Sequence, residues 1–452
     1  MTDQQVAAPP LEKTLQIELA GTEPIPAAER HGKPRTLFTL WFGANVQFAT
    51  LSVGALSTSV FGLDLGLAAI AVTLGTLLSG CLIGLLSVRG ARAGVPQLIQ
   101  SRAPFGWFGN LPAAVITVVN GIGWYVVDTL LGIFILRHLL GIGLLPALVI
   151  MAGAQLSIPL FGYRMIHTLE RVLGALLLAV FVVVSFYGFG HAASGPAIGP
   201  FAGTFGAFVL TVSVTSARGL GWAMYSSDYS RYLPADTSAW RIFGAATGGT
   251  VAAGAWIGVL GAALGTVAAV SDPTTLVSQQ LPHTLGTITL IFLLGSTLAS
   301  TVLDLYSGAM AALVAGIAIP RWVSVVVVTG CGTIAAWLAG QTDFASSFQN
   351  FLLLMSYWLA PWTAVTLVAL FWRDRGRVDL ALLYDRTHKF GRGLPAVLLG
   401  VLAAVPFMNQ SLYTGPLASA HPALGGIGHM VGFAVAGLAY ALMTASSARA
   451  AR

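Results

Sequence analysis

The sequence predicts an all-α polytopic membrane protein with twelve transmembrane helices. Of its 452 residues, 56% are hydrophobic and only 8% are charged, whereas a soluble domain carries about 25% charged residues. The mean hydropathy of +0.82 agrees with this class. The 53 glycines also fit it, because small residues let helices approach each other closely in lipid. These observations exclude a soluble enzyme.

Windows of about 20 apolar residues, the length that crosses roughly 30 Å of hydrocarbon, follow one another along the chain. The twelve windows lie near residues 36–61, 63–88, 109–136, 142–161, 171–190, 201–226, 246–270, 284–316, 321–340, 349–372, 394–411 and 424–444.

The basic residues predict the orientation of these helices. If the N-terminus is cytoplasmic, all but two of the 22 Lys and Arg residues lie in cytoplasmic loops or tails, as the positive-inside rule requires. The exceptions are Arg137 at the outer side and Arg218 within a span. We therefore expect an integral protein of the cytoplasmic membrane, with a mobile cytoplasmic tail over 1–35 and a second one over 445–452. The basic loops account for the net charge of +6, so lipid and a small molecule are the expected partners, and nucleic acid is not.

Three charged residues lie inside the predicted spans: Asp128, Arg218 and Asp304. A charge at the bilayer centre costs about 2.5–3.5 kcal/mol on insertion scales. In one interpretation, Arg218 pairs with Asp128 or Asp304 and the pair only fixes helix packing. In the other, the charged groups face a water-filled cavity, with Arg218 at its outer side, and handle a substrate or ions.

Two spacings favour the second interpretation. Asp128 follows Trp124 by four residues, so both lie on one helix face, where a ring and a carboxylate suit a flat ligand with N–H groups. In the window 284–316, Thr297, Ser300, Thr301 and Asp304 also share a face. Hydroxyl and carbonyl oxygens are ligands that a small hard cation prefers. The alternative for each hydroxyl is a bond back to its own helix.

Two spans carry signs of a broken helix. The first contains WFGANVQF (41–48), with Gly43, Asn45 and Gln47, and the sixth contains SARGLGW (216–222). These are matching positions in two five-helix halves, residues 36–190 and 201–372, and an odd number of helices per half makes the second half inverted. Interrupted segments in matching positions indicate the binding site of a transporter. The last two helices, within 394–444, lie outside the repeat.

Five stretches together resemble the nucleobase:cation symporter family, specifically its purine–cytosine permease branch (cytosine permease-like). They are WFGANVQF, SRAPFGWFGN (101–110), NGIGWYVVDTLLG (120–132), GLGWAMYSSDYSRYLP (219–234) and LDLYSGAM (303–310). The resemblance implies a leucine-transporter-like fold of two inverted five-helix repeats plus two C-terminal helices. It also implies alternating-access uptake of a nucleobase or related ring, coupled to Na⁺ or H⁺.

The resemblance also implies a set of site residues. The substrate residues would be Trp124 and Trp222 as stacking aromatics, Asp128 where some members have an amide, Gly221 with its backbone groups, Gln47 in the first span, and Asp304 close to the substrate. A sodium site would use the carbonyls of Gly43 and Val46 with Thr297, Ser300 and Thr301. In DYSRY, we expect Asp228 and Arg231 to make structural and gating contacts with neighbouring loops.

The buried aspartates leave the coupling ion open, because a buried carboxylate can take up a proton and H⁺ therefore rivals Na⁺. No cofactor is expected, and the chain is expected to act as a monomer or weak oligomer. Another heterocycle, such as hydroxymethylpyrimidine, allantoin or a hydantoin, is an alternative substrate of an H⁺-coupled transporter. An intramembrane aspartyl protease is a remote alternative, since neither Asp128 nor Asp304 stands in a GxGD motif. A channel is a second remote alternative.

Overall fold

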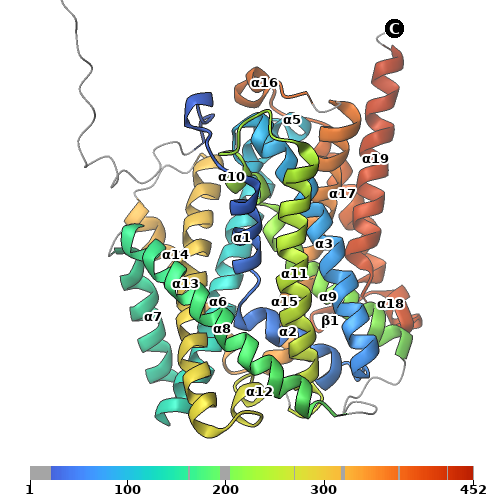
Figure 1. The fold of residues 1–452 in the computed structure, drawn as a ribbon. Coiled ribbons are helices and arrows are strands. Elements are labelled where there is room, and N and C mark those ends of the chain that lie inside the picture. Colours follow the sequence, from blue (N-terminus) through green and yellow to red (C-terminus); the bar gives the residue numbers. More distant parts are fainter. Residues whose placement is uncertain are drawn as a thin grey trace, which may run out of the picture.

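The computed structural model describes residues 22–160, 163–193, 204–268, 270–316, 321–374, 377–424 and 426–450, and these form a bundle of helices (Figure 1). Each apolar window predicted from the sequence overlaps a helix. The long elements are α1 (Pro34–Gly43), α2 (Phe48–Ser59), α3 (Leu65–Ala93), α6 (Leu111–Leu140), α7 (Leu144–Leu160), α8 (Tyr163–His191), α9 (Thr204–Ala223), α11 (Ala239–Gly265), α13 (His283–Val314), α14 (Arg321–Ala339), α15 (Phe344–Leu367), η3 (Val368–Arg373), α17 (Gly393–Ala404) and α19 (Gly428–Ala450).

Short elements join the long helices at both ends of the bundle. They are η2 (Ala27–Glu29), α4 (Gln97–Gln100), α5 (Arg102–Phe105), α10 (Ser226–Ser230), α12 (Thr275–Ser278), α16 (Leu380–Tyr384), η4 (Val405–Phe407), α18 (Pro416–Ala420) and η5 (Pro422–Leu424). Two strands, β1 (Asn409–Gln410) and β2 (Tyr413–Thr414), pair antiparallel in a small hairpin.

Seven helices of the described part are long and apolar enough to cross a membrane. Three shorter apolar helices, within α7, α14 and the α17–η4 segment, accompany them. Large apolar side chains point outward from several of these helices; Phe186 is 76% exposed and Leu402 is 66% exposed. An apolar surface of this kind marks a membrane-facing protein, so the chain is an integral membrane protein.

The charged loops gather at one end of the bundle. Figure 1 places α5, α10, α16 and the last turns of α19 at the top, and α12, α18 and the strand hairpin at the bottom. The top, which carries Arg102, Arg231 and Arg386, is called the basic end below. The helices α3 and α13 contribute to the basic end with their last turns, while α6 and α11 begin there.

The described end of the predicted N-terminal tail is packed against the basic end. The prediction of a mobile arm over 1–35 is wrong for residues 22–33, and residues 1–21 lie outside the described part. Ile25 is buried, and its N–H donates to the carbonyl of Gly94 at 2.9 Å. The Arg30 side chain donates to the carbonyls of Ile25 and Ala91. Main-chain bonds and one buried apolar side chain thus fix a segment whose composition suggested disorder.

The sixth span is not broken at SARGLGW. The helix α9 runs through Gly219 and Gly221 to Ala223, so the expected unwinding at 219–222 is wrong. The glycines instead allow close packing: a Cβ at Gly219 would overlap the Ser79 hydroxyl of α3. A short non-helical step at Met224 and Tyr225 then separates α9 from α10.

Glycine also brings α2 against α11. A Cβ at Gly261 would overlap the carbonyl of Leu51, and a Cβ at Gly54 would overlap the carbonyl of Gly258. The Thr58 hydroxyl donates to the carbonyl of Ala262 at 2.8 Å across the same contact. The second half of the first span is therefore fixed on α11 at backbone distance, as small residues permit in membrane helices.

Candidate functional site

The first span is interrupted between α1 and α2, as the sequence predicted. Gly43 ends α1, and Gln47 precedes α2 with an extended backbone at φ −151° and ψ 162°. The N–H of Val46 donates to the carbonyl of Gly43 at 3.0 Å, and the Asn45 side chain donates to the carbonyl of Trp41 at 2.7 Å. These bonds satisfy backbone groups that the missing helical turn would leave unpaired in a low-water interior.

Arg218 lies on α9 beside this break and is only 4% exposed. Its two Nη atoms donate to Asn45 Oδ1 at 2.9 and 3.0 Å, and Nη2 also donates to the Thr50 hydroxyl on α2. Among the described residues, the expected ion pair of Arg218 with Asp128 or Asp304 does not form. The physical reason is that Asn45 and Thr50 supply oxygens on either side of the break, within hydrogen-bond distance of the guanidinium.

Trp124 forms one wall of the candidate site on α6. Its ring packs edge-on against Phe348 and Phe351 of α15, with ring centroids 6.2 and 5.5 Å apart. Asp128 follows one turn later on the same face, as the spacing predicted. The ring and the carboxylate therefore lie together, with two aromatic rings of α15 holding the indole in place.

Gly221 keeps α9 close to this face of α6. A Cβ at position 221 would lie 3.1 Å from Trp124 Nε1 and 3.6 Å from Asn120 Oδ1. Asn120 is buried. Asn120 was not among the predicted site residues, although its position four residues before Trp124 was a visible signal. The structure adds this amide to the group.

Asp128 of α6 and Asp304 of α13 lie on two helices that pack against each other. The Ser300 hydroxyl, one turn before Asp304 on α13, donates to Gln47 Oε1 at 3.3 Å. Asp304 is close enough to Asp128 for their negative charges to repel each other. Both aspartates are buried, and the Oδ2 atom of each has no hydrogen-bond partner in the described part of the chain. Unpaired buried carboxylate oxygens are costly, so the pair is suited to a ligand with N–H donors or to a proton.

The predicted sodium-site hydroxyls face in different directions. Ser300 faces Gln47 beside the break, whereas Thr297 donates to the carbonyl of Leu294 at 2.8 Å in its own helix. Thr301 donates to the carbonyl of Thr297 at 2.9 Å. For these two threonines, the alternative of a bond back to the helix is the observed arrangement.

A buried glutamine of α7 joins the site to the neighbouring helices. Gln155 donates to the Thr301 hydroxyl at 2.9 Å and accepts from the Thr129 hydroxyl at 3.0 Å. Gln155 was also missed from the sequence, because a single amide in an apolar window carries no spacing signal. It cross-links α6, α7 and α13 next to Asp128.

Trp222 belongs to a different aromatic group from Trp124. Its ring makes edge contacts with Trp41 at 6.0 Å and with Tyr225 at 6.4 Å, and it is 9% exposed. Trp41 also makes an edge contact with Tyr229 at 5.7 Å. Trp222 thus packs with α1 and α10 toward the basic end, while Trp124 packs with α15.

The DYSRY stretch makes contacts at the basic end. Asp228 Oδ1 accepts from the N–H of Gln97 at 2.7 Å, which ties α10 to α4. Ser227 donates to Gln97 Oε1 at 2.7 Å as well. Arg231 is buried and lies over the Tyr232 ring at 5.2 Å. The contact of Asp228 with Gln97 is structural, and the gating role expected for Asp228 and Arg231 stays a prediction.

The SRAPFG stretch fixes the same end from the other side. Arg102 stacks on the Trp107 ring at 3.8 Å and donates to the carbonyls of Leu383 at 3.4 Å and Val314 at 3.3 Å. Burial lowers the pKa of Arg102 to about 10, because a buried guanidinium loses the hydration of its charge. Arg102 therefore joins α5, α13 and α16.

The sequence is similar to those of known permeases. A family model described as "Permease for cytosine/purines, uracil, thiamine, allantoin" matches residues 24–432. A putative purine-cytosine permease, YxlA, of Bacillus subtilis is 30% identical over 94% of this chain and 95% of its own. The purine-cytosine permease fcyB of Emericella nidulans is 27% identical over 95% of this chain and 89% of its own.

Solved structures share the fold. Mhp1, a nucleobase-cation-symport-1 family transporter in a closed conformation with bromovinylhydantoin bound, is 19% identical and matches with a TM-score of 0.75 over 96% of each chain. Its inward-facing form matches with a TM-score of 0.77 over 96% of this chain and 94% of that one.

A helix bundle with a broken first span, and with Arg218 buried beside the break, is consistent with the permeases named above, and their similarity identifies the chain as a membrane transporter and not an enzyme. The chain belongs to the family of permeases for cytosine, purines, uracil, thiamine and allantoin, as the resemblance of its motifs implied.

Proposed function

We propose that the chain imports an aminated nucleobase or a closely related ring by cation symport. The observation that carries this proposal is Trp124 beside the Asp128–Asp304 pair at the break of the first span. The ring of Trp124 offers a stacking surface, and the unpaired carboxylate oxygens accept ring or amino N–H groups. An all-carbonyl face, such as that of uracil, would meet these carboxylates with repulsion.

Gln47, Asn120 and the backbone near Gly221 complete the proposed substrate site. The two amides can each donate and accept, so they suit the mixed donor and acceptor edge of cytosine or a purine. Trp222 is proposed as the aromatic group beneath the site, on the side of the basic end. The names of relatives support this substrate class, since both purine-cytosine permeases above cover nearly the whole chain. Because the vitamin B6 transporter TPN1 of Saccharomyces cerevisiae is a more distant relative, another heterocycle stays an alternative substrate.

For the coupling ion, we propose a proton carried by the Asp128–Asp304 pair. One proton removes the repulsion between two buried carboxylates that share a site, and both keep an oxygen without a partner. The alternative is Na⁺ bound by the carbonyls of Gly43 and Val46 with the α13 hydroxyls. It is less favoured because the Thr301 oxygen already accepts from the Gln155 amide at 2.9 Å, which occupies a lone pair that a cation would need.

The finer topology is also part of the proposal. We propose twelve spans, with inverted repeats over 36–190 and 201–372 and two further helices within 394–444. Both termini would lie on the cytoplasmic side together with the basic end, because the positive-inside rule places Lys and Arg there. The chain would work as a monomer or weak oligomer. Labelling of single cysteines introduced in α12 and α16, with a reagent that does not cross membranes, tests the orientation.

Uptake into proteoliposomes tests the substrate proposal. With labelled cytosine and adenine, we expect accumulation above equilibrium that Trp124→Ala abolishes, while Trp240→Ala, at a side chain 79% exposed, leaves it unchanged. Asp128→Asn should weaken binding of amino-bearing bases more than binding of uracil. Normal uptake by Trp124→Ala would rule out the assigned site. Equilibration without accumulation would indicate a channel.

The coupling ion is tested separately at fixed substrate. Replacing Na⁺ by choline at constant pH should leave uptake unchanged, and collapsing the proton gradient with a protonophore should stop accumulation. The reverse pattern would assign coupling to Na⁺ and overturn the role proposed for the carboxylate pair.

A further inference from the structure

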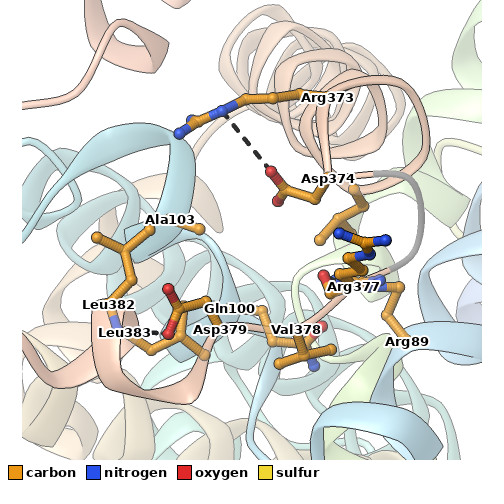
Figure 2. Close-up of a pocket in the computed structure, with 11 residues that line it drawn as sticks. Arg89, Gln100, Ala103, Arg373, Asp374, Arg377, Val378, Asp379, Leu382 and Leu383 are labelled. Carbon is orange, nitrogen blue, oxygen red and sulfur yellow. Dashed lines mark hydrogen bonds and ion pairs between the residues drawn. The ribbon is translucent and has the colours of Figure 1, made fainter.

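A cavity outside the candidate substrate site lies at the basic end. The end of α3, the segment containing α4 and α5, the end of η3 and the start of α16 surround it. It has a volume of about 310 Å³, and its polar lining comes from Arg89, Gln100, Arg373, Asp374, Arg377 and Asp379 (Figure 2). It is called the loop cavity here. None of these residues belongs to the candidate substrate site, so the loop cavity requires a separate explanation.

Arg89 is the unusual member of this lining. It is only 2% exposed, and it donates from Nη2 to the carbonyl of Arg377 at 2.7 Å. Its Nε and Nη1 atoms are buried without a hydrogen-bond partner in the described part of the chain. A guanidinium stays charged at all physiological pH values, and leaving buried donors of a charged group unpaired is costly. The site therefore lacks an acceptor at Arg89.

The acidic residues of the loop cavity are already engaged. Asp374 forms an ion pair with Arg373 at 3.6 Å, shown by a dashed line in Figure 2. Asp379 accepts from the N–H of Leu382 at 3.2 Å and so caps α16. Three arginines and two aspartates line the space, which leaves an excess of one positive charge.

The missing acceptor is best supplied by an oxygen-rich anion. Arg recognises phosphate with parallel N–H donors in a fixed geometry, and the loop cavity is large enough for a phosphate group with its substituent. Phe371 and Trp372, which immediately precede Arg373, are 41% and 71% exposed. Aromatic residues mark the membrane–water interface, so the loop cavity lies near the depth of lipid headgroups, where basic pockets between helices bind anionic lipids.

We propose that the loop cavity binds a phosphate-bearing anion, anchored by the buried guanidinium of Arg89 and by Arg377 at its exposed side. The phosphate would come either from an anionic lipid headgroup or from a soluble phosphate compound. Bound there, it would link the end of α3 to the segment that leads into α16, at the end of the bundle opposite α12 and α18.

Thermal shift of the delipidated full-length protein in detergent tests the proposal. The probes are inorganic phosphate, phosphatidylglycerol and, as a neutral lipid, phosphatidylcholine. We expect phosphatidylglycerol to raise the melting temperature more than phosphatidylcholine at equal concentration. A rise with inorganic phosphate of equal size would assign the site to soluble phosphate, and a rise with phosphatidylglycerol alone would assign it to a headgroup.

Four variants separate the site from general effects of charge. Arg89→Gln should lose the shift, and Arg377→Gln should reduce it by at least half, which keeps the test valid if the first variant folds poorly. Arg92→Gln, at an exposed arginine on the last turn of the same helix, should keep the shift. Asp374→Asn should enlarge it, because removing a carboxylate favours an anion. Absence of any shift in the unmodified protein, or equal shifts in Arg377→Gln and Arg92→Gln, would overturn the proposal.

Discussion

The hydrogen bonds between Arg218 and Asn45 give a sharp prediction about the break in the first span. In Asn45→Ala, two charged donors lose the acceptor that they share at 2.9 and 3.0 Å. A hydrogen bond to a charged group contributes about 1.5–3 kcal/mol, and because Nη2 keeps its bond to the Thr50 hydroxyl, the two lost bonds together contribute about 2–4 kcal/mol. The same change removes the bond from Asn45 to the carbonyl of Trp41, for about 1 kcal/mol. We therefore expect a loss of about 3–5 kcal/mol in unfolding free energy.

Denaturant titration of the solubilised protein measures this loss, with uptake measured in parallel. Thr39→Ala is the matched control on α1, because Thr39 is exposed and donates only to the carbonyl of Thr36 in its own helix; it should change stability by less than about 0.5 kcal/mol. Asn45→Asp should retain more stability than Asn45→Ala, since a carboxylate supplies the opposite charge. A loss below about 1 kcal/mol in Asn45→Ala would refute the reasoning that this amide satisfies a buried cation.

Three further predictions concern packing, the α7 link and pH. Gly261→Ala should destabilise the protein by about 1–3 kcal/mol in the same titration, because the added Cβ would overlap the Leu51 carbonyl. The control is Gly244→Ala on the same helix, whose Cβ meets nothing within 4 Å and which should be neutral or mildly stabilising. Equal effects of the two variants would refute the close contact between α2 and α11. Gln155→Met should cost about 1–3 kcal/mol and lower uptake, because it removes the two buried hydrogen bonds that join α7 to Thr129 and Thr301. Full stability would show that the link is dispensable. Hydrogen bonds from the Thr387 hydroxyl and backbone N–H lower the pKa of Asp385. The contribution of Asp385 to stability is therefore present above its unfolded pKa and is lost as pH falls through the lowered folded pKa. The melting-temperature difference between the unmodified protein and Asp385→Asn should vanish in acid, and a difference that grows there would contradict the assignment.

The sequence was sufficient for features that repeat along the chain. Each apolar window overlaps at least one of the long helices, because lipid requires about 20 apolar residues whatever their order. The break near Gly43 was predictable because two amides, Asn45 and Gln47, stand in the middle of an apolar window. The spacing of Ser300 and Asp304 likewise predicted one polar face, and the structure brings that face to Asp128.

Features that depend on a neighbouring helix could not be predicted. Gly219 and Gly221 signalled a break, but their real neighbours are Ser79 and Trp124, and only packing distinguishes unwinding from close approach. The partner of Arg218 was missed for a related reason: a carboxylate is the obvious partner by charge, while geometry selected an amide. Gln155 gave no signal at all, because its partners lie on two other helices.

The Ser300 hydroxyl has a consequence for how the two halves of the first span are tied to the rest of the bundle. It donates to Gln47 Oε1 at 3.3 Å, and Gln47 is the residue from which α2 starts. Asn45, two residues earlier, accepts from Arg218 of α9. The segment between α1 and α2 is therefore held by side chains of two different helices, so a movement of α13 relative to α9 would be transmitted to the first span through two amides.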